Sequence, residues 1–339
     1  MHGFGYYIIT RMNRTLNWGL LSTAHINHAL IRPIRSSARS QLLAVASRNQ
    51  PSAEAFARRN KIPRSYGSYE QLLADPEIDI VYNPLPNNLH AQWTINALRS
   101  GKHVLCEKPL ALTLEDVDAV RLAARESGRL AVEAFMYRHH PQTLQVKQLV
   151  EDGAFGRLQL IKGSFTFMLD RPGNYRLVKE MGGGSLWDVG CYPVSYARFL
   201  TGAQPIEVFG RQVLGADGVD LSFFGMMRFP GDIFAQFDCG FASPFRASME
   251  IIGSDATLNI TVPFKPGRRE KIYLTRGGRV ETIKINGQDL YLGEVEDLCD
   301  AIQSGTTPRL SLEDSRATTA AILALLESAN AGRPISNID

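Results

Sequence analysis

Lys108 and Tyr192 are the two side chains of this sequence best suited to moving a proton at a substrate hydroxyl. When an alcohol carbon loses a hydride, a base must take the hydroxyl proton, and a tyrosine phenol can act as that acid/base. An unperturbed phenol titrates near about pH 10, so a nearby cation that favours the phenolate would make the base effective at neutral pH. We predict that Lys108 is this cation, or that it hydrogen-bonds the substrate hydroxyl directly.

Asp188 and Arg176 are two further candidates for this chemistry. If the segment from Ser185 is helical, Asp188 and Tyr192 lie at positions i and i+4 on one face, where Asp188 would orient Tyr192 or bind a neighbouring hydroxyl. Pro193 opposes a regular helix there. Arg176, in the preceding loop, is predicted to contact substrate. The alternatives are that Tyr192 is an ordinary core residue, that Asp188 is an ordinary carboxylate at a helix start, and that Arg176 is a solvated loop charge.

The elements that must position these groups alternate along the first part of the chain. From Leu16 to Phe135, amphipathic stretches are interspersed with short apolar runs at 17–22, 41–47, 64–66, 78–84, 102–108 and 129–135. This pattern predicts a doubly wound α/β domain with a six-stranded parallel sheet. The carboxyl ends of such strands line the ligand crevice, and Lys108 stands at the end of the fifth run.

The first two turns of this sheet indicate a dinucleotide. Ser22 to Asn27 occupy the place of a GxGxxG phosphate cradle with none of its glycines, so that cofactor binding and simple helix capping by Ser22 or Thr23 both remain open. After the second strand come Ser47 and Arg48, with no carboxylate for a ribose hydroxyl. A guanidinium suits a 2′-phosphate, which favours NADP(H) over NAD(H), although Arg48 could also be a solvated loop residue.

After Phe135 the pattern changes to strand-like segments without long intervening helices. A helix at 142–151 precedes runs at 158–167, 206–215, 219–229, 232–241 and 247–253, and helices return at 291–303 and 312–330. We expect a largely antiparallel sheet in a second, α+β domain. The expected division is an N-terminal extension at 1–12, a dinucleotide-binding domain at 13–135 and the second domain at 136–339.

Composition limits the partners of the chain. Its 339 residues suit two domains, and with 44% hydrophobic and 21% charged residues no apolar run reaches the length of a membrane span. The net charge of +3 is scattered, so we expect a small-molecule partner and neither nucleic acid nor membrane. We expect no metal site and reduced cytoplasmic thiols, because there is no CxxC pair among Cys106, Cys191, Cys239 and Cys299.

Four segments resemble the glucose-fructose oxidoreductase/inositol dehydrogenase (Gfo/Idh/MocA) family over about residues 14–335. They are NPLPNNLH (83–90), HVLCEKPLALT (103–113), EAFMYRHHP (133–141) and GGGSLWDVGCYPVSYARFLTG (182–202). Tyr192 stands where many inositol-type members have His. In this respect the sequence resembles the branch that contains glucose-fructose oxidoreductase, dimeric dihydrodiol dehydrogenase and NADP-dependent xylose dehydrogenases. The resemblance implies a Rossmann domain, an open-faced second sheet that pairs subunits, and hydride transfer on a sugar or cyclic alcohol.

The resemblance also implies which residues form the site. Lys108 and Tyr192 are its catalytic residues. On the residue chemistry above we add Asp188 to the catalytic group and expect substrate contacts at Lys108, Arg176, Asp188 and Tyr192. His90 opens the helix after the fourth strand, where cofactor contact and helix packing are equally open. The expected cofactor contacts are Ser22, Thr23, Ala24, His25, Ile26, Ser47, Arg48, Asn83, Leu85, Pro86, Asn87, His90, Glu107, Lys108, Pro109 and Arg138.

The expected function is therefore an NADP-dependent oxidoreductase acting on a sugar or cyclic diol, assembled as a homo-oligomer, most simply a homodimer, through the second sheet. One alternative is a reductase of a keto- or anhydro-sugar that uses the same site. The other is a dinucleotide-sensing regulator of the same fold without turnover, because fold alone never guarantees chemistry. The presence of both Lys108 and Tyr192 favours an enzyme, since a regulator needs no acid/base pair.

Overall fold

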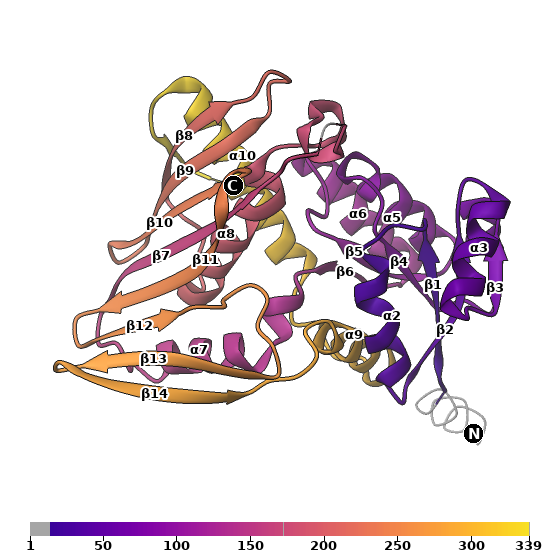
Figure 1. Ribbon diagram of the computed structural model, residues 1–339, viewed down its shortest axis with the longest axis horizontal. Helices are drawn as coiled ribbons and strands as arrows, with labels where there is room; N and C mark the ends of the chain where they lie inside the picture. The colour runs from indigo at the N-terminus through magenta and orange to yellow at the C-terminus, as the bar shows by residue number, and fades with distance from the viewer. Residues whose placement is uncertain (1–13, 172, 339) are drawn as a thin grey trace. The chain divides into compact units, whose positions relative to one another are not determined.

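The computed structural model describes residues 14–171 and 173–338, which form two compact units. The first unit contains residues 14–111, 115–136 and 291–312, and the second contains 112–114, 137–290 and 313–338. The extension predicted for residues 1–12 lies outside the described residues. Figure 1 shows each unit as a sheet with helices packed on it.

The first unit is built on a six-stranded parallel sheet in the order β3-β2-β1-β4-β5-β6. Its strands are β1 Leu16–Leu21, β2 Ser40–Ala46, β3 Arg64–Tyr66, β4 Ile80–Asn83, β5 His103–Glu107 and β6 Ala131–Ala134. The central strands are buried on both faces, which is why they appear in the sequence as continuous apolar runs. The predicted doubly wound sheet is confirmed, and its strand order reverses between β1 and β4, where such folds bind ligands.

Except for α9, the helices of this unit lie between successive strands, as the right-handed crossover of parallel strands requires. They are α2 Asn27–Ser36, α3 Gln50–Asn60, α4 Tyr69–Ala74, η1 Asn87–Leu89, α5 His90–Arg99, α6 Leu114–Ser127 and α9 Leu292–Ser304. Helix α9 follows the second sheet in the chain but packs in the first unit. It is held there by Arg39, which pairs with Glu296, and by Ser40, whose Oγ lies 3.2 Å from Sγ of Cys299.

The second unit contains a nine-stranded sheet in the order β14-β13-β12-β11-β7-β10-β9-β8-β15. Every neighbouring pair is antiparallel except β7 with β10, so the predicted, largely antiparallel sheet is confirmed. Its strands are β7 Leu158–Met168, β8 Glu207–Leu214, β9 Asp220–Phe229, β10 Ile233–Gly240, β11 Ala242–Gly253, β12 Ala256–Ile260, β13 Arg269–Arg276, β14 Arg279–Asn286 and β15 Ile335–Ser336.

Two helices of the second unit pack closely on one face of this sheet. A Cβ at Gly163 of β7 would lie 2.8 Å from Cβ of Pro193, and one at Gly210 of β8 would lie 2.6 Å from the carbonyl oxygen of Leu325. The glycines therefore allow helices α8 and α10 to approach the strands. The helical elements are η2 Met136–His139, α7 Pro141–Glu151, η3 Tyr175–Leu177, η4 Lys179–Met181, the π-turn η5 Leu186–Gly190, α8 Cys191–Thr201 and α10 Leu312–Ala331. No helix in the described part of the chain is long and apolar enough to cross a membrane.

Candidate active site

The first strand-to-helix turn keeps the shape of a phosphate cradle without its glycines. Ser22 has φ 65°, the left-handed conformation that usually requires glycine, and its carbonyl accepts a 2.8 Å hydrogen bond from Nδ2 of Asn27. Helix α2 then begins with no side-chain cap at Ile26 and no acidic residue in its first turn. The N–H groups of Asn27, His28 and Ala29 donate to the carbonyls of Ala24, His25 and Ile26 at 3.1, 3.1 and 2.9 Å, so what the turn offers an anion such as a pyrophosphate is the positive end of the α2 dipole. Thr23, Ala24 and His25 complete this turn.

The second turn presents a guanidinium to solvent. Ser47 donates its N–H to the carbonyl of Tyr66 at 3.0 Å, and Asn49 caps α3 by accepting the N–H of Ser52 at 3.0 Å. Arg48 stands exposed between these two anchored residues and forms no ion pair with the described residues. The turn therefore holds a fixed backbone and a cation that no ion-pair partner in the described part of the chain neutralises.

Hydrogen bonds of two buried side chains hold the segment after β4 in place. Asn83 is fully buried, and its Nδ2 donates to the carbonyl of His90 at 3.0 Å and to Oγ1 of Thr94 at 3.1 Å. The His90 ring nitrogens lie 2.7 Å from the carbonyl oxygen of Pro109 and 2.6 Å from that of Leu85. His90, 1% exposed, therefore ties the β4 loop to the turn after β5. Its role is to position the loop that carries Leu85, Pro86 and Asn87.

Burial lowers the pKa of His90 to about 4, with a smaller contribution in the same direction from the charge of Lys108, although the two carbonyl oxygens act in the opposite direction. The ring is therefore neutral at physiological pH. The effect of Lys108 on His90 also shows that the lysine lies close to this linkage. Lys108 itself is half-buried at the carboxyl end of β5, directly before a cis bond to Pro109.

Carboxylates surround the turn that contains Lys108. Glu107 accepts a 2.6 Å hydrogen bond from the hydroxyl of Tyr82, and Glu133 on β6 accepts the N–H of Leu110 at 2.9 Å. Glu294 on α9 is fully buried, and its two carboxylate oxygens have no hydrogen-bond partner in the described part of the chain. Burial, and then the charge of Glu107, raises the pKa of Glu294 well above its ordinary value. Glu294 is thus a neutral acid packed beside this turn.

The second unit brings Arg176, Asp188 and Tyr192 together. Nε of Arg176 donates a 2.7 Å hydrogen bond to Oδ2 of Asp188, whose side chain is 8% exposed. Burial lowers the pKa of Arg176, but the charge of Asp188, followed by those of Tyr175 and Tyr192, outweighs burial and raises it. Arg176 therefore lies close enough to Tyr192 for their charges to interact. A cation beside a phenol is the arrangement that favours a phenolate base.

The backbone around this cluster is set by glycines and a buried carboxylate. Gly183 and Gly184 donate their N–H groups to the carbonyls of Val178 and Arg176, at 3.0 and 2.9 Å. A Cβ at Gly184, which has φ 118°, would lie 2.2 Å from Oδ1 of Asp220. Asp220 accepts from the hydroxyl of Ser185 and the N–H of Leu186 at the start of the π-turn. These contacts fix both the loop that carries Arg176 and the turn that carries Asp188.

The expected helix from Ser185 exists, but it begins as a π-turn at 186–190 before α8 continues from Cys191. Pro193, which has no N–H to donate, stands directly after the π-turn, where the hydrogen-bond pattern of the helix is already irregular, and the helix continues past it to Thr201. Tyr192 is 5% exposed, and its ring packs against those of Tyr137, Phe165 and Phe264. This packing fixes the direction of the phenol.

Arg138, expected to contact the cofactor, lies in the interior of the second unit. Its NH2 pairs with Oδ2 of Asp314 at 2.9 Å, its NH1 donates to Oγ of Ser195 at 3.0 Å, and the guanidinium stacks 4.1 Å over Phe199. The structure therefore gives Arg138 a packing role. The other predicted cofactor residues lie together in the first unit, and Arg176, Asp188 and Tyr192 lie in the second; the pairing of Lys108 with Tyr192 stays a prediction.

Comparisons with known proteins decide the family. Residues 16–135 match the oxidoreductase family with an NAD-binding Rossmann fold, and residues 143–259 match the GFO/IDH/MocA C-terminal domain. The chain belongs to the Gfo/Idh/MocA family of oxidoreductases. It is 35% identical to a D-xylose 1-dehydrogenase (NADP(+)) of Haloferax volcanii over 94% of this chain and 98% of that one. It is 33% identical to the trans-1,2-dihydrobenzene-1,2-diol dehydrogenase of Danio rerio over 72% and 74% of the two chains.

A solved structure agrees with this family. The 3-ketoreductase KijD10 of Actinomadura kijaniata, in complex with NADP and TDP-benzene, superposes with a TM-score of 0.88 at 28% identity, covering 93% of this chain and 98% of that one. The same ketoreductase has also been solved with a tyrosine replaced by phenylalanine and with a lysine replaced by alanine. As a Gfo/Idh/MocA member, the protein is an NAD(P)-dependent oxidoreductase, and the uncapped start of α2 and the exposed Arg48 suit such a dinucleotide.

Sequence reasoning missed three residues that lie near the predicted site residues of their own unit. Asp220 contacts the start of the π-turn and Glu294 lies near Glu107, each from far along the chain, and no local motif marks either residue. Tyr82 was counted only as an apolar strand residue. A signal was available for Glu294, because it is a carboxylate in the first turn of an apolar helix, but that position alone is equally typical of a helix start.

Proposed function

We propose that this protein transfers hydride between NADP(H) and a hydroxyl of a sugar or cyclic diol, with Tyr192 as the acid/base supported by Lys108. In this proposal residues 13–135 bind the dinucleotide and residues 136–339 bind the substrate. The observation that carries it is the cluster of Arg176, Asp188 and Tyr192, in which a titratable phenol stands beside a cation fixed by a buried carboxylate. Such combinations are typical of active sites.

The residues divide the proton chemistry between them. Bound NADP would supply the hydride acceptor, and the chain must then remove the hydroxyl proton. Tyr192 takes this proton on its phenolate oxygen, and the positive charge of Arg176 stabilises that phenolate. Asp188 holds Arg176 in place through the 2.7 Å ion pair. Lys108 adds a second cation at the substrate hydroxyl, which is the role that its position at the end of β5 supports.

The polar groups of the second unit favour a polyhydroxylated substrate. A guanidinium and a carboxylate together offer donors and acceptors for neighbouring hydroxyls. The names of two relatives, a xylose dehydrogenase and a dihydrobenzenediol dehydrogenase, support a sugar or cyclic diol. The second candidate is the reverse reaction on a keto-sugar, which the 3-ketoreductase KijD10 favours and for which Tyr192 would donate the proton.

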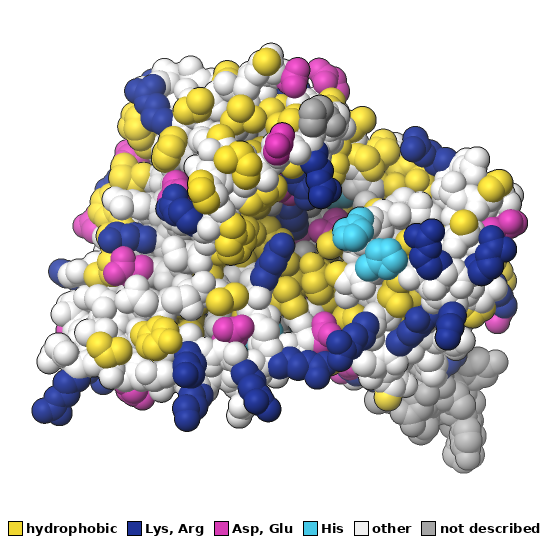
Figure 2. Space-filling model, in the orientation of Figure 1, with side chains coloured by type: hydrophobic (Ala, Val, Ile, Leu, Met, Phe, Trp, Pro, Cys, Tyr) yellow, Lys and Arg dark blue, Asp and Glu magenta, His cyan; other side chains and the backbone are white. Residues whose placement is uncertain are grey.

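The exposed face of the second sheet supports a homo-oligomer. Figure 2 shows hydrophobic side chains gathered over β8, β9 and β10. A groove of about 430 Å³ on this face is lined by Phe209, Phe224 and Met226. Phe224 and Phe245 are 52% and 68% exposed, which is costly for a monomer. We place the assembled enzyme in the cytoplasm, a proposal supported by four buried cysteines that form no disulfide.

The test combines cofactor binding with turnover. Fluorescence titration should show tighter binding of NADPH than of NADH, and a panel of aldoses, ketoses and cyclic diols should identify a substrate. Tyr192→Phe should keep NADPH binding and lose about 100-fold or more in turnover. Tyr196→Phe is the matched control, because it removes a buried hydroxyl from the same helix. Full turnover by Tyr192→Phe, or binding without turnover on any substrate, would overturn the proposal.

A further inference from the structure

Arg176 is held in place at several points, yet the two terminal nitrogens of its guanidinium are not used. Its N–H donates to Oδ1 of Asn174 at 3.0 Å, and its carbonyl accepts the N–H of Gly184 at 2.9 Å. Its Nε donates to Oδ2 of Asp188. NH1 and NH2 form no hydrogen bond or ion pair with the described residues. A guanidinium has five N–H donors in one plane, so four remain after the bond from Nε.

Arg138 shows how an arginine with a packing role differs. Both of its terminal nitrogens are bonded inside the second unit, NH1 to Oγ of Ser195 and NH2 to Oδ2 of Asp314, and its side chain is 6% exposed. The side chain of Arg176 is 29% exposed. Ordering a long side chain costs conformational entropy, which the bonds of Arg138 offset. Arg176 is ordered as well, but its terminal donors have no acceptor among the described residues.

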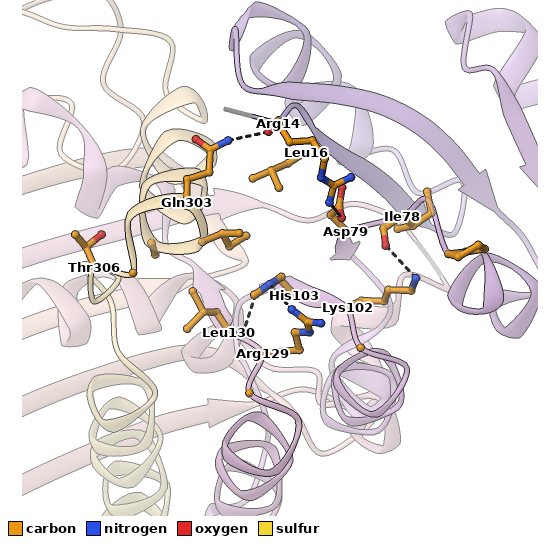
Figure 3. A pocket seen from close by; sticks show the side chains of 16 residues that line it. Arg14, Leu16, Ile78, Asp79, Lys102, His103, Arg129, Leu130, Gln303 and Thr306 are labelled. Carbon is orange, nitrogen blue, oxygen red and sulfur yellow. Dashed lines mark hydrogen bonds and ion pairs between the residues drawn. The ribbon is translucent and has the colours of Figure 1, made fainter. Parts of the chain in front are cut away.

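A cavity of about 570 Å³ at the edge where the strands of the first sheet begin gives a second comparison (Figure 3). Arg14 pairs there with Asp79, and the ammonium of Lys102 donates to the carbonyl oxygen of Asp75 at 2.6 Å. The charges of Asp75 and Asp79 both act on Lys102. These two basic side chains therefore have protein acceptors within the first unit, unlike the terminal nitrogens of Arg176.

Tyr175 supports the guanidinium from one side. Cζ of Arg176 lies over the Tyr175 ring, 4.7 Å from its centroid. Both residues belong to one short turn, η3, in which the N–H of Val178 donates to the carbonyl of Tyr175 at 3.0 Å. A cation is attracted to an aromatic face, and the flat guanidinium stacks well on such a ring. Tyr175 and Asp188 therefore hold the guanidinium from two directions and set where NH1 and NH2 point.

The combination of Arg176 with Asp188 suits hydroxyl oxygens. The two terminal nitrogens form a fork that binds two neighbouring oxygens. A hydroxyl can accept from the fork and also donate its own proton to a carboxylate. A ligand carboxylate can only accept, and it would bring a second negative charge beside Asp188. In the proposed function Tyr192 acts on the reacting hydroxyl, so the fork is left for the hydroxyls beside it.

We propose that NH1 and NH2 of Arg176 bind two adjacent hydroxyls of the substrate, next to the hydroxyl that reacts at Tyr192, and that Tyr175 is the positioning residue for this contact. The inference rests on the proposed function, because it takes Tyr192 as the group that exchanges the proton. It narrows the substrate class to rings with three consecutive hydroxyls, as sugars have. A ring with only two hydroxyls loses one charge-assisted hydrogen bond to the fork.

The test is a ligand-detected NMR titration of the full chain with cyclohexane-1,2,3-triol and with cyclohexane-1,2-diol. NADPH is present in both titrations and prevents turnover, because it cannot accept a hydride. We expect the wild type to bind the triol about tenfold more tightly than the diol, the contribution of one charge-assisted hydrogen bond. Tyr175→Leu should abolish this preference, and Tyr175→Phe should keep it, since a phenyl ring also attracts the cation. Tyr273→Leu, which removes a half-buried tyrosine from β13, is the matched control and should keep it.

Two further measurements separate positioning from a structural role. Arg176→Lys keeps the positive charge but has no planar fork, so it should bind the triol and the diol equally. With a substrate that turns over, Tyr175→Leu should raise KM about tenfold and keep kcat. It should also leave the acid limb of the pH–rate profile in place, because the charge of Arg176 remains. A structural role of Tyr175 would instead weaken triol and diol binding alike and lower the melting temperature.

The inference and the proposed function can fail separately. Equal affinity of the wild type for the triol and the diol, no saturable binding of the triol, or an unchanged preference in Tyr175→Leu or Arg176→Lys would overturn the inference. Turnover without the triol preference would remove this inference and leave the proposed function standing. The triol preference without turnover on any substrate would remove the proposed function and support the fork of Arg176 as a binding site for adjacent hydroxyls.

Discussion

Arg176 donates a 2.7 Å hydrogen bond from Nε to Oδ2 of Asp188, and this largely buried ion pair stands within electrostatic reach of Tyr192. The pair fixes the guanidinium of Arg176 near the proposed base inside a single unit. We therefore propose that Arg176 supports the phenolate together with the Lys108 predicted from the sequence. This changes which substitution should alter the pH dependence of the reaction.

Arg176→Gln should move the acid limb of the pH–rate profile to higher pH. Removal of the guanidinium charge makes the phenolate of Tyr192 less favourable, so the base is deprotonated only at higher pH. At pH 7 we expect turnover to fall about tenfold or more. The measurement is kcat/KM from pH 6 to 10. Arg171→Gln in the same loop removes an exposed charge and should leave the profile in place. An unshifted limb in Arg176→Gln would assign Arg176 to substrate binding alone.

Arg48→Ala should reduce the preference for NADPH. The exposed guanidinium after β2 has no described protein ion pair, so its contact with a 2′-phosphate would be a charge-assisted hydrogen bond formed only with NADPH. Loss of such a contact should raise the Kd for NADPH by about 10- to 100-fold and leave the Kd for NADH unchanged. Fluorescence titration of both cofactors measures this. Arg58→Ala, an exposed arginine on α3, serves as the control. Equal weakening of both cofactors would contradict the assignment.

His90 should make the protein less stable in acid. The pKa of His90 is about 4 in the folded protein against an ordinary value of 6.5. Its contribution to the free energy of unfolding is therefore complete above pH 6.5 and is lost as pH falls toward 4. The difference corresponds to about 3 kcal/mol of unfolding free energy. Urea unfolding at pH 7 and pH 4.5 should show a smaller pH effect for His90→Gln than for the wild type. Exposed His25, replaced by Gln, should retain the wild-type slope. An unchanged slope in His90→Gln would show that other groups control acid stability.

The sequence predicts the first unit better than the second for a physical reason. Strands such as β4 and β5 are buried on both faces and appear as continuous apolar runs, which are easy to recognise. Strands β13 and β14 were not predicted, because their exposed positions carry residues such as Arg269 and Lys284 and only one face is apolar. Gly277 and Gly278 form the turn between them, with positive φ at both residues, as is typical of a hairpin turn.

The candidate site was predicted only as far as local motifs extend. The segment with Lys108 and the GGG segment each have a recognisable pattern, so Lys108, Asp188 and Tyr192 could be named. The ion pair of Arg176 with Asp188 depends on how the GGG loop folds back. Asp220 on β9 contacts the π-turn of the second unit, and Glu294 on α9 lies near Glu107 in the first unit. Contacts of this kind depend on tertiary packing, which one sequence does not encode in any local pattern.

Glu294 should make the protein less stable as pH rises. Burial and the nearby charge of Glu107 hold the carboxyl neutral in the folded state, whereas in the unfolded chain it ionises near its ordinary value. For an acid whose pKa is raised on folding, the stabilising contribution is complete below the ordinary value and is lost as pH rises through the folded value. Glu294→Gln keeps the size and the neutral state of the side chain but cannot ionise.

We therefore expect the difference in melting temperature between Glu294→Gln and the wild type to grow with pH. The melting temperature of Glu294→Gln, minus that of the wild type, should increase steadily from pH 5 to pH 9. Glu296→Gln, two residues along the same helix, removes a partly exposed carboxylate paired with Arg39, and its difference should show no such rise. If the melting temperatures of Glu294→Gln and the wild type change in parallel with pH, the folded protein accommodates an ionised Glu294. In that case the carboxyl would need a hydrogen-bonded water or ligand beside Glu107 and Tyr82 to offset its burial.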